Sequence, residues 1–282
     1  MQYRKTAIIA SSCFILIGLI SFALRGSANF GIDFTGGTLV RYKFSEVVQT
    51  GDVRNWLEEI GLSKATIQSY DNGKGILIKT PGETRKEVEN IINNKFASLN
   101  PIVEEEVTIG PVVGRLLKKQ ALLAMTFALI GILLYIGWRF EFTFGFAAVI
   151  CIFHDVLFTV GIFSLTRREI SLSVIAALLT IVGYSLNDTI VVFDRIRENL
   201  KFQHKHRNIP EIINTSINQT LSRTIITAGT TLLPVLALLF LGGPVIKDFA
   251  FALAIGILIG TYSSIYIASP LLIVMRKNLK VR

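Results

Sequence analysis

The stretch LSVIAALLTIVGYSLNDTIVVF, residues 172–193, decides the fold class of this chain. A helix needs about 20 predominantly apolar residues to cross a bilayer, and this stretch provides them. Its only acidic residue is Asp188. The stretch therefore predicts a membrane-spanning helix that carries one acid close to its end.

The rest of the chain repeats this pattern. Of its 282 residues, 51% are hydrophobic and only 17% are charged, whereas globular domains carry about 25% charged residues. We predict a polytopic α-helical membrane protein rather than a soluble enzyme. The six predicted spans are residues 6–24, 121–138, 144–165, 172–193, 224–241 and 248–275.

The first apolar stretch has two interpretations. Arg4 and Lys5 precede it, and Ser21-Phe22-Ala23 resembles the cleavage site of a secretory signal. Its apolar core is longer than the roughly 7–15 residues of a signal peptide, and five further spans follow. We therefore expect an uncleaved anchor.

The net charge of +9 comes from basic residues that flank the apolar stretches, which is typical of orientation signals and not of a nucleic-acid surface. We predict that both termini are cytoplasmic. Arg115, Lys118 and Lys119 break the pattern, but they end a long translocated segment, where the charge rule is weak. The basic residues of the predicted inner segments are Arg4, Lys5, Arg139, Arg195, Arg197, Lys201, Lys205, Arg207, Arg276, Lys277, Lys280 and Arg282.

The segment between the first two spans has a fold signature of its own. Alternation predicts strands at 38–44, 64–70, 75–80 and 102–109, and helical spacing predicts helices at 52–60 and 83–99. Asp71-Asn72-Gly73 predicts a hairpin between the middle strands. The order is βαββαβ, a small α+β ferredoxin-like domain. Three parts follow: 1–25 with the first span, a periplasmic domain at 26–118, and five spans at 119–282.

Polar side chains within the fourth and fifth spans are the candidate functional residues, because ionisable groups inside lipid are costly. Asp188 and Arg223 form a candidate proton-coupling pair, since arginine stays charged and gains or loses its partner as the acid ionises. Two alternatives stay open: Asp188 lies near the interface, or Arg223 extends to the inner headgroups. The polar side chains that accompany the pair at helical spacing are Thr180, Tyr184, Asn187, Thr227, Thr230 and Thr231.

His154 and Asp155 lie near the middle of the third span. Adjacent helical residues point about 100° apart, so we expect them not to share one partner. Structural hydrogen bonding and proton transfer are both open for this pair. Residues 194–200 mix charges in a way that is typical of a solvated helix. No histidine–cysteine cluster has metal-ligand spacing, and we predict no metal and no cofactor.

Three motifs carry a family resemblance: FGIDFTGGT at 30–38, NDTIVVFDRIREN at 187–199 and LSRTIITAGTTLLP at 221–234. Together with His154-Asp155 they closely resemble the SecF branch of the SecD/SecF protein-export family, over essentially the whole chain. The resemblance implies a resistance-nodulation-division-type membrane fold in the bacterial inner membrane. It implies SecD, the SecYEG channel with its accessory subunits, the translocating preprotein and membrane lipids as partners. It also implies that Asp188 carries the proton that drives late steps of translocation, with Arg223 as its partner.

Three other functions are weighed against this one. A half-transporter for lipids or small hydrophobic solutes shares the fold class, but exporters of that class typically have larger outer domains. An intramembrane aspartyl protease would use Asp155 and Asp188, but the usual Gly-x-Gly-Asp setting is absent. A passive scaffold of the translocon would not need Asp188 or Arg223.

Overall fold

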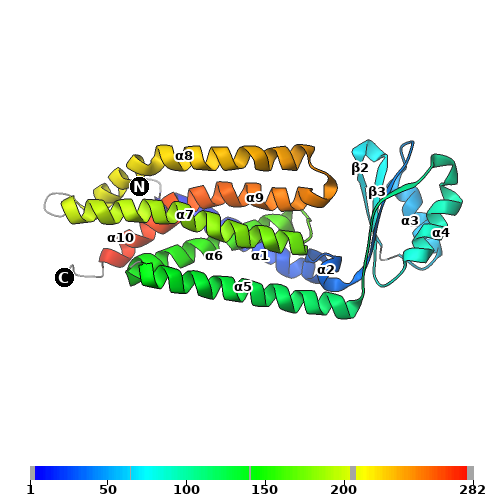
Figure 1. Ribbon diagram of the computed structural model, residues 1–282, viewed down its shortest axis with the longest axis horizontal. Helices are drawn as coiled ribbons and strands as arrows, with labels where there is room; N and C mark the ends of the chain where they lie inside the picture. Colours follow the sequence, from blue (N-terminus) through cyan, green and yellow to red (C-terminus); the bar gives the residue numbers. More distant parts are fainter. Residues whose placement is uncertain (1–3, 64, 140, 204–207, 278–282) are drawn as a thin grey trace. The chain divides into compact units, whose positions relative to one another are not determined.

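The computed structural model describes residues 4–63, 65–139, 141–203 and 208–277. They form two compact units (Figure 1): Met1–Asn29 with Leu123–Arg282, and Phe30–Leu122. Lys205, Arg207, Lys280 and Arg282 of the predicted inner segments lie outside the described residues.

The first unit is a helical bundle, and six helices within the described residues are long and apolar enough to cross a membrane. The predicted polytopic fold is confirmed. The helices are α1 (Arg4–Arg25), α5 (Pro111–Arg139), α6 (Phe142–Leu165), α7 (Leu172–Gln203), α8 (Ile209–Leu241) and α9 (Pro244–Ser263). A π-helical turn, η4 (Ser264–Ala268), connects α9 to α10 (Ser269–Lys277).

The helices divide into an inner and an outer set. In α6, α7 and the α9 span, 50–56% of the most apolar window is buried within the protein, against 11% in α1, α5 and α8. Figure 1 shows α6, α7 and α9 between α8 on one side and α5 on the other. These three helices therefore have more of their surface covered by other helices than α1, α5 and α8 do.

Glycines allow the inner helices to approach closely. A Cβ atom on Gly256 of α9 would lie 2.2 Å from Ile181 Cγ1 of α7, and one on Gly260 would lie 3.1 Å from Ser185 Cβ. The α7–α9 contact thus depends on the Gly256-x-x-x-Gly260 step.

The second unit has the predicted ferredoxin-like order: β1 (Gly37–Lys43), α3 (Thr50–Glu59), β2 (Thr66–Tyr70), β3 (Gly75–Thr80), α4 (Arg85–Lys95) and β4 (Ile102–Ile109). The antiparallel sheet has the strand order β2-β3-β1-β4. Apolar residues of β1 and β3 pack against α3 and α4 in one core, which includes Val40, Leu57, Ile78 and Ile92.

Two short 3-10 segments complete this unit: η2 (Asp71–Gly73) joins β2 to β3, and η3 (Ala97–Leu99) follows α4. A third, η1 (Gly26–Asn29), follows α1 in the first unit. Asp71 and Asn72 have φ values of 50° and 53°. These are the left-handed conformations that a tight hairpin requires. The hairpin predicted at these residues is present.

The two glycines of FGIDFTGGT form the passage from the short helix α2 (Ile32–Thr35) to β1. Gly36 has φ +73° and Gly37 has φ +138°, and a Cβ on Gly37 would lie 2.5 Å from the Thr80 carbonyl oxygen. Both the backbone conformation and the space therefore require glycine here.

Candidate functional site: two buried acids in the helix bundle

Asp188 lies on the buried side of α7, with 3% of its surface exposed. Thr261 of α9 donates a hydrogen bond to Asp188 Oδ2 at 3.5 Å, which is long for such a bond. Asp188 is an enclosed carboxyl group with one weak donor.

Arg223 of α8 is exposed on the surface of the chain. Among the described residues, no ion pair within 4.0 Å joins these two side chains. The structure therefore places the predicted pair on neighbouring helices without direct contact.

Within the threonine stripe of α8, each hydroxyl group donates a hydrogen bond to a carbonyl group of α8 itself. Thr227 donates to the Arg223 carbonyl at 2.9 Å, Thr230 to the Ile226 carbonyl at 2.9 Å, and Thr231 to the Thr227 carbonyl at 2.8 Å. Thr180 of α7 is likewise bonded to the Ala176 carbonyl at 2.9 Å. The donor of each of these hydroxyl groups is thus used within its own helix.

Tyr184 and Asn187 take different positions around Asp188. Tyr184 is partly buried against the apolar cluster of Val235, Ala254 and Ile257. Its hydroxyl group approaches Thr231 without a well-formed hydrogen bond. Asn187 is exposed. Of these two residues, Tyr184 is the one that packs between α7, α8 and α9.

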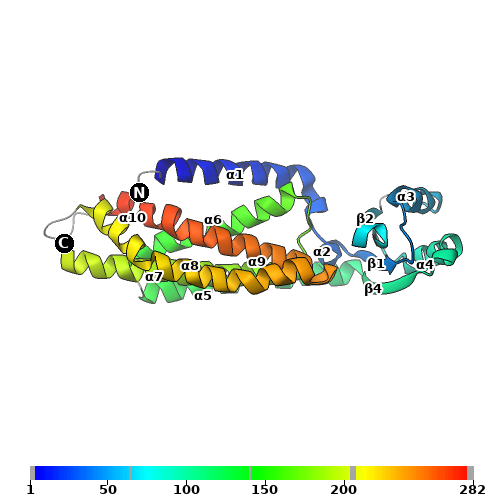
Figure 2. The same cartoon turned by 90° about the horizontal axis from the view of Figure 1, so that it is seen from above.

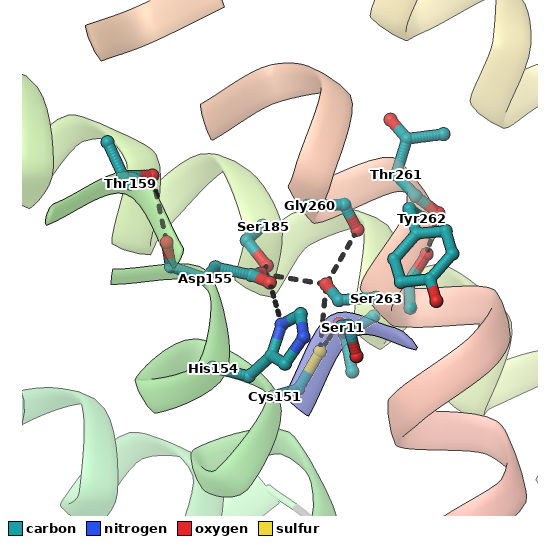
Figure 3. A network of polar contacts seen from close by, with 12 residues as sticks. Ser11, Cys151, His154, Asp155, Thr159, Ser185, Gly260, Thr261, Tyr262 and Ser263 are labelled. Carbon is teal, nitrogen blue, oxygen red and sulfur yellow. Dashed lines mark hydrogen bonds and ion pairs between the residues drawn. The ribbon is translucent and has the colours of Figure 1, made fainter. Parts of the chain in front are cut away.

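Asp155 of α6 forms the second buried acid, with 1% of its surface exposed. Figure 3 shows its carboxylate at the meeting point of three helices. Ser263 of α9 donates to Oδ2 at 2.8 Å, Ser185 of α7 donates to the same oxygen, and His154 Nδ1 lies 2.9 Å from Oδ1. Both carboxylate oxygens thus have partners, and these partners hold α6, α7 and α9 together.

The neighbours of this acid extend the network. The Cys151 thiol donates to Ser263 Oγ at 3.1 Å, and the Thr159 hydroxyl donates to the Asp155 backbone carbonyl at 2.8 Å. The His154 ring stacks on Phe158 and Tyr262, with centroids 6.1 and 6.5 Å away. His154 Nε2 is buried without a hydrogen-bond partner among the described residues.

His154 and Asp155 therefore contact each other, although their positions on the helix predict different partners. Rotation about the side-chain bonds brings Nδ1 to the carboxylate across the 100° between the two residues. Of the roles left open, structural hydrogen bonding is the one that this geometry shows directly.

A third polar cluster, which we did not predict, joins α7 to α8 beyond Asp188. Asn199 Nδ2 donates to Ser216 Oγ and to Gln219 Oε1, both at 2.8 Å, and Arg195 Nε donates to Gln219 Oε1 at 2.7 Å. Asn199 and Leu200 are buried. The expectation of a solvated helix at residues 194–200 is therefore wrong, because α8 covers one side of this segment.

The chemistry available here is proton uptake and hydrogen bonding. Among the described residues, no group of three histidine, cysteine or acidic side chains could hold a metal ion. A six-helix bundle with buried acids and a small ferredoxin-like unit between its first two spans defines a class of protein: multi-pass membrane proteins whose polar groups lie within the bundle.

Comparison with known proteins gives the particular family. The model of "Protein export membrane protein SecD/SecF, C-terminal" matches residues 88–278, and that of the "SecD/SecF GG Motif" matches residues 29–46. The chain is 47% identical to protein translocase subunit SecF of Desulfurispirillum indicum, over 98% of this chain and 91% of that protein. It is 44% identical to the SecF subunit of Thermodesulfovibrio yellowstonii, over 98% and 94%.

The crystal structure of SecDF from Thermus thermophilus, described as a translocon-associated membrane protein, superposes with a TM-score of 0.86 at 42% identity. It matches 99% of this chain, which spans only 39% of that longer protein. A structure of SecDF in a super-membrane-facing form superposes with a TM-score of 0.69 at 41% identity. The chain belongs to the SecD/SecF protein-export family.

Proposed function

We propose that this chain is a subunit of a protein-export machinery that uses the proton gradient to promote late steps of preprotein translocation. The observation that supports this most strongly is Asp188, an acid 3% exposed within a membrane span and without an ion-pair partner among the described residues. An ionisable residue within a membrane span is by default a candidate functional residue, and proton relays are among the roles that such residues have.

The proposed cycle uses the position of Arg223. When Asp188 is ionised, the guanidinium on α8 is attracted towards it, and protonation removes that attraction. One charge that crosses 100 mV contributes about 2.3 kcal/mol, which shifts a two-state equilibrium about fifty-fold. The gradient can therefore drive a rearrangement of α7 and α8.

The proposed partner is SecD. The Thermus thermophilus SecDF protein is 45% identical over 90% of this chain, which covers 35% of that protein. SecD is proposed to correspond to the part of SecDF that this chain does not match. The SecYEG channel with its accessory subunits, the translocating preprotein and the surrounding lipid are the other proposed partners.

The proposed location is the bacterial inner membrane, with both termini in the cytoplasm and residues 26–118 in the periplasm. The start of α1, the end of α7, the start of α8 and the end of α10 lie at one end of the bundle (Figures 1 and 2). Arg4 and Lys5 lie at the start of α1, and Arg195, Arg197 and Lys201 lie in the last turns of α7, which supports this orientation.

The test is protein export into membrane vesicles that carry this chain with SecD, with and without an imposed proton gradient. Asp188→Asn and Arg223→Ala are compared with wild type and with Asp194→Asn. Asp194 lies on the same helix, but it is 43% exposed and pairs with Arg139. We expect Asp188→Asn and Arg223→Ala to assemble normally and to lose the gradient-dependent part of export, while Asp194→Asn keeps it.

Export at the wild-type level in both variants would contradict the coupling role, and this chain would then be a scaffold of the translocon. Gradient-driven release of lipid or small hydrophobic solutes without preprotein would favour the half-transporter instead. The outer unit, Phe30–Leu122, holds one small four-stranded domain, which favours the export subunit over that alternative.

A further inference from the structure

We infer that Asp155 is a positioning residue that holds α7 and α9 in a fixed register around Asp188, which leaves α8 as the helix that moves. The inference rests on the proposed function of Asp188, and it assigns a role to an acid that the proposed coupling step does not use.

The two hydroxyl donors to Asp155 lie close in sequence to Asp188 and to its own donor, Thr261. Ser185 comes three residues before Asp188 on α7, and Ser263 comes two residues after Thr261 on α9. The segments that hold Asp155 are thus the same segments that carry Asp188 and its hydrogen-bond donor. Any shift of α7 along α9 would break the bonds at both acids.

Thr261 and Ser263 point in nearly opposite directions from α9. Residues two apart on a helix point about 200° from each other. Ser263 donates to Asp155 and Thr261 donates to Asp188, so α9 contacts one acid on each of two opposite sides. Figure 3 shows Thr261 directed away from the Asp155 carboxylate. A rotation of α9 is therefore opposed from both sides.

The backbone of α9 comes close to α7 at Gly260 and changes its helical form just after Ser263. Gly260 lies against Ser185, and this close approach lets Ser185 and Ser263 reach one carboxylate oxygen. The helix then widens into the π-helical turn Ser264–Ala268, directly after Ser263. Ser269 Oγ donates to the Ser264 carbonyl at 2.8 Å within this turn. Such turns are rare in proteins overall, but many of those that occur lie at functional sites.

Helix α8 differs from α7 and α9, whose serines donate to Asp155, because its threonine hydroxyl groups donate to its own backbone. Thr227, Thr230 and Thr231 donate to carbonyl groups of α8 itself. This part of α8 meets α9 through apolar contacts, with Val235 against Ala254 and Ile257. Pro234 interrupts its backbone hydrogen bonding. Among the described residues, the side-chain hydrogen bonds that join α8 to α7 lie at its other end, at Ser216 and Gln219, so we expect α8 to move about that end.

The titratable groups around each acid differ. His154 and Cys151 of α6 surround Asp155, together with the uncharged Ser185 of α7 and Ser263 of α9, and Tyr262 stacks on His154. Tyr184 of α7 and Arg223 of α8 are the titratable or charged groups described around Asp188, and α9 faces it with Thr261. Neither acid contacts the other directly, so an effect of Asp155 on Asp188 must pass through α7 and α9.

The first experiment measures the labelling of Asp188 by a hydrophobic carbodiimide, which reacts with protonated carboxyl groups, as a function of pH. Vesicles carry the full chain with SecD, and mass spectrometry identifies the labelled residue. We expect Asp155→Asn and Ser263→Ala to change the labelled fraction of Asp188 at a fixed pH about threefold or more, a shift of about half a pH unit. The control Asp194→Asn should match wild type.

Loss of folded protein lowers the amount of label but does not move the midpoint, so the midpoint separates positioning from general stability. If Asp155→Asn fails to assemble, Ser263→Ala keeps the carboxylate and still tests the inference. Wild-type midpoints in these variants would overturn it. Labelling of Asp155 over the same pH range would also overturn it, because Asp155 would then be a proton carrier.

The second experiment locks pairs of helices with disulfides in a Cys13→Ser chain and measures gradient-driven export. Ile181→Cys with Gly256→Cys joins α7 to α9, at a place where the Ile181 side chain now fills the space. Val235→Cys with Ala254→Cys joins α8 to α9. We expect the α7–α9 lock to leave export within about twofold of wild type, and the α8–α9 lock to lower it about tenfold until a reductant is added.

The reverse result would overturn the inference. Failure of the proposed function is distinguishable, because export would then be insensitive to Asp188→Asn and to both locks, while the labelling of Asp188 would still report whether Asp155 positions it.

Discussion

Asp155 and Asp188 lie in the same helix bundle and are almost equally buried, with 1% and 3% of their surfaces exposed. Their surroundings differ. Asp155 has three hydrogen-bonding partners from α6, α7 and α9. Asp188 has one donor at 3.5 Å and a cation on α8 that does not touch it.

The difference teaches that burial alone does not identify a group that changes its charge. A carboxylate that is surrounded by matched donors gains much of its stability from them and resists change. A buried carboxyl group with few partners has little to lose when it is protonated. We therefore expect mutation of Asp155 to lower mainly the stability of the fold. Mutation of Asp188 should lower mainly the coupling of export to the proton gradient.

The largest effect on stability is expected for Asp155→Ala, because it leaves Ser185, Ser263 and His154 without their shared acceptor. We expect a loss of about 3–5 kcal/mol in the free energy of unfolding. Asp188→Asn should cost less than about 1 kcal/mol. Unfolding by sodium dodecyl sulfate in mixed micelles, followed by circular dichroism, measures both, and equal losses would remove the distinction.

Ser185→Ala should have the next largest effect, since it removes one of the two hydroxyl donors to Asp155 Oδ2. A hydrogen bond to a charged group contributes about 1.5–3 kcal/mol, and we expect a loss in this range. Ser222→Ala on the exposed side of α8 is the matched control and should lie within about 0.5 kcal/mol of wild type. The same unfolding titration applies, and a neutral Ser185→Ala would mean that the serine does not hold α7.

Thr261→Val should cost about 0.5 kcal/mol, because the bond that it removes is long and its acceptor has no other close donor. The comparison is with Ser263→Ala on the same helix, which loses a 2.8 Å bond to the better surrounded acid. The ratio of the two losses in unfolding free energy is the measured quantity. A Thr261→Val loss as large as that of Ser263→Ala would show that Asp188 is held as firmly as Asp155.

The smallest effect is expected for Thr230→Val on α8, whose hydroxyl group is bonded within its own helix and whose side chain is exposed. We expect a change of less than about 0.5 kcal/mol in the free energy of unfolding. Gradient-driven export should also stay at the wild-type level. A strong loss of export in a stable protein would mean that Thr230 contacts a group outside this chain.

Much of the fold followed from local patterns. Each of the six spans contains its own run of apolar residues, and each strand of the outer unit shows its alternation within 5 to 8 residues. Asp71-Asn72-Gly73 predicted the hairpin because those residue types tolerate the left-handed conformations found there. Signals of this kind lie within one element and need no knowledge of its neighbours.

The candidate site was only partly predictable. Asp188 and Arg223 stood out as ionisable residues in apolar stretches. Ser185 and Ser263 did not, because serine is common in membrane helices and its partner, Asp155, lies 30 and 108 residues away in the sequence. Asn199, Ser216 and Gln219 were missed for a similar reason, since their contact joins two helices that each look polar by themselves.

The sequence by itself determined the number of spans, the ferredoxin-like order of the outer unit and the presence of costly ionisable groups in lipid, because hydrophobicity and backbone periodicity act over short segments. Only the tertiary structure decided which acid is satisfied and which is not. That depends on which hydroxyl groups and glycines of α7 and α9 meet α6 in space, and a contact between three helices leaves no pattern within any one of them.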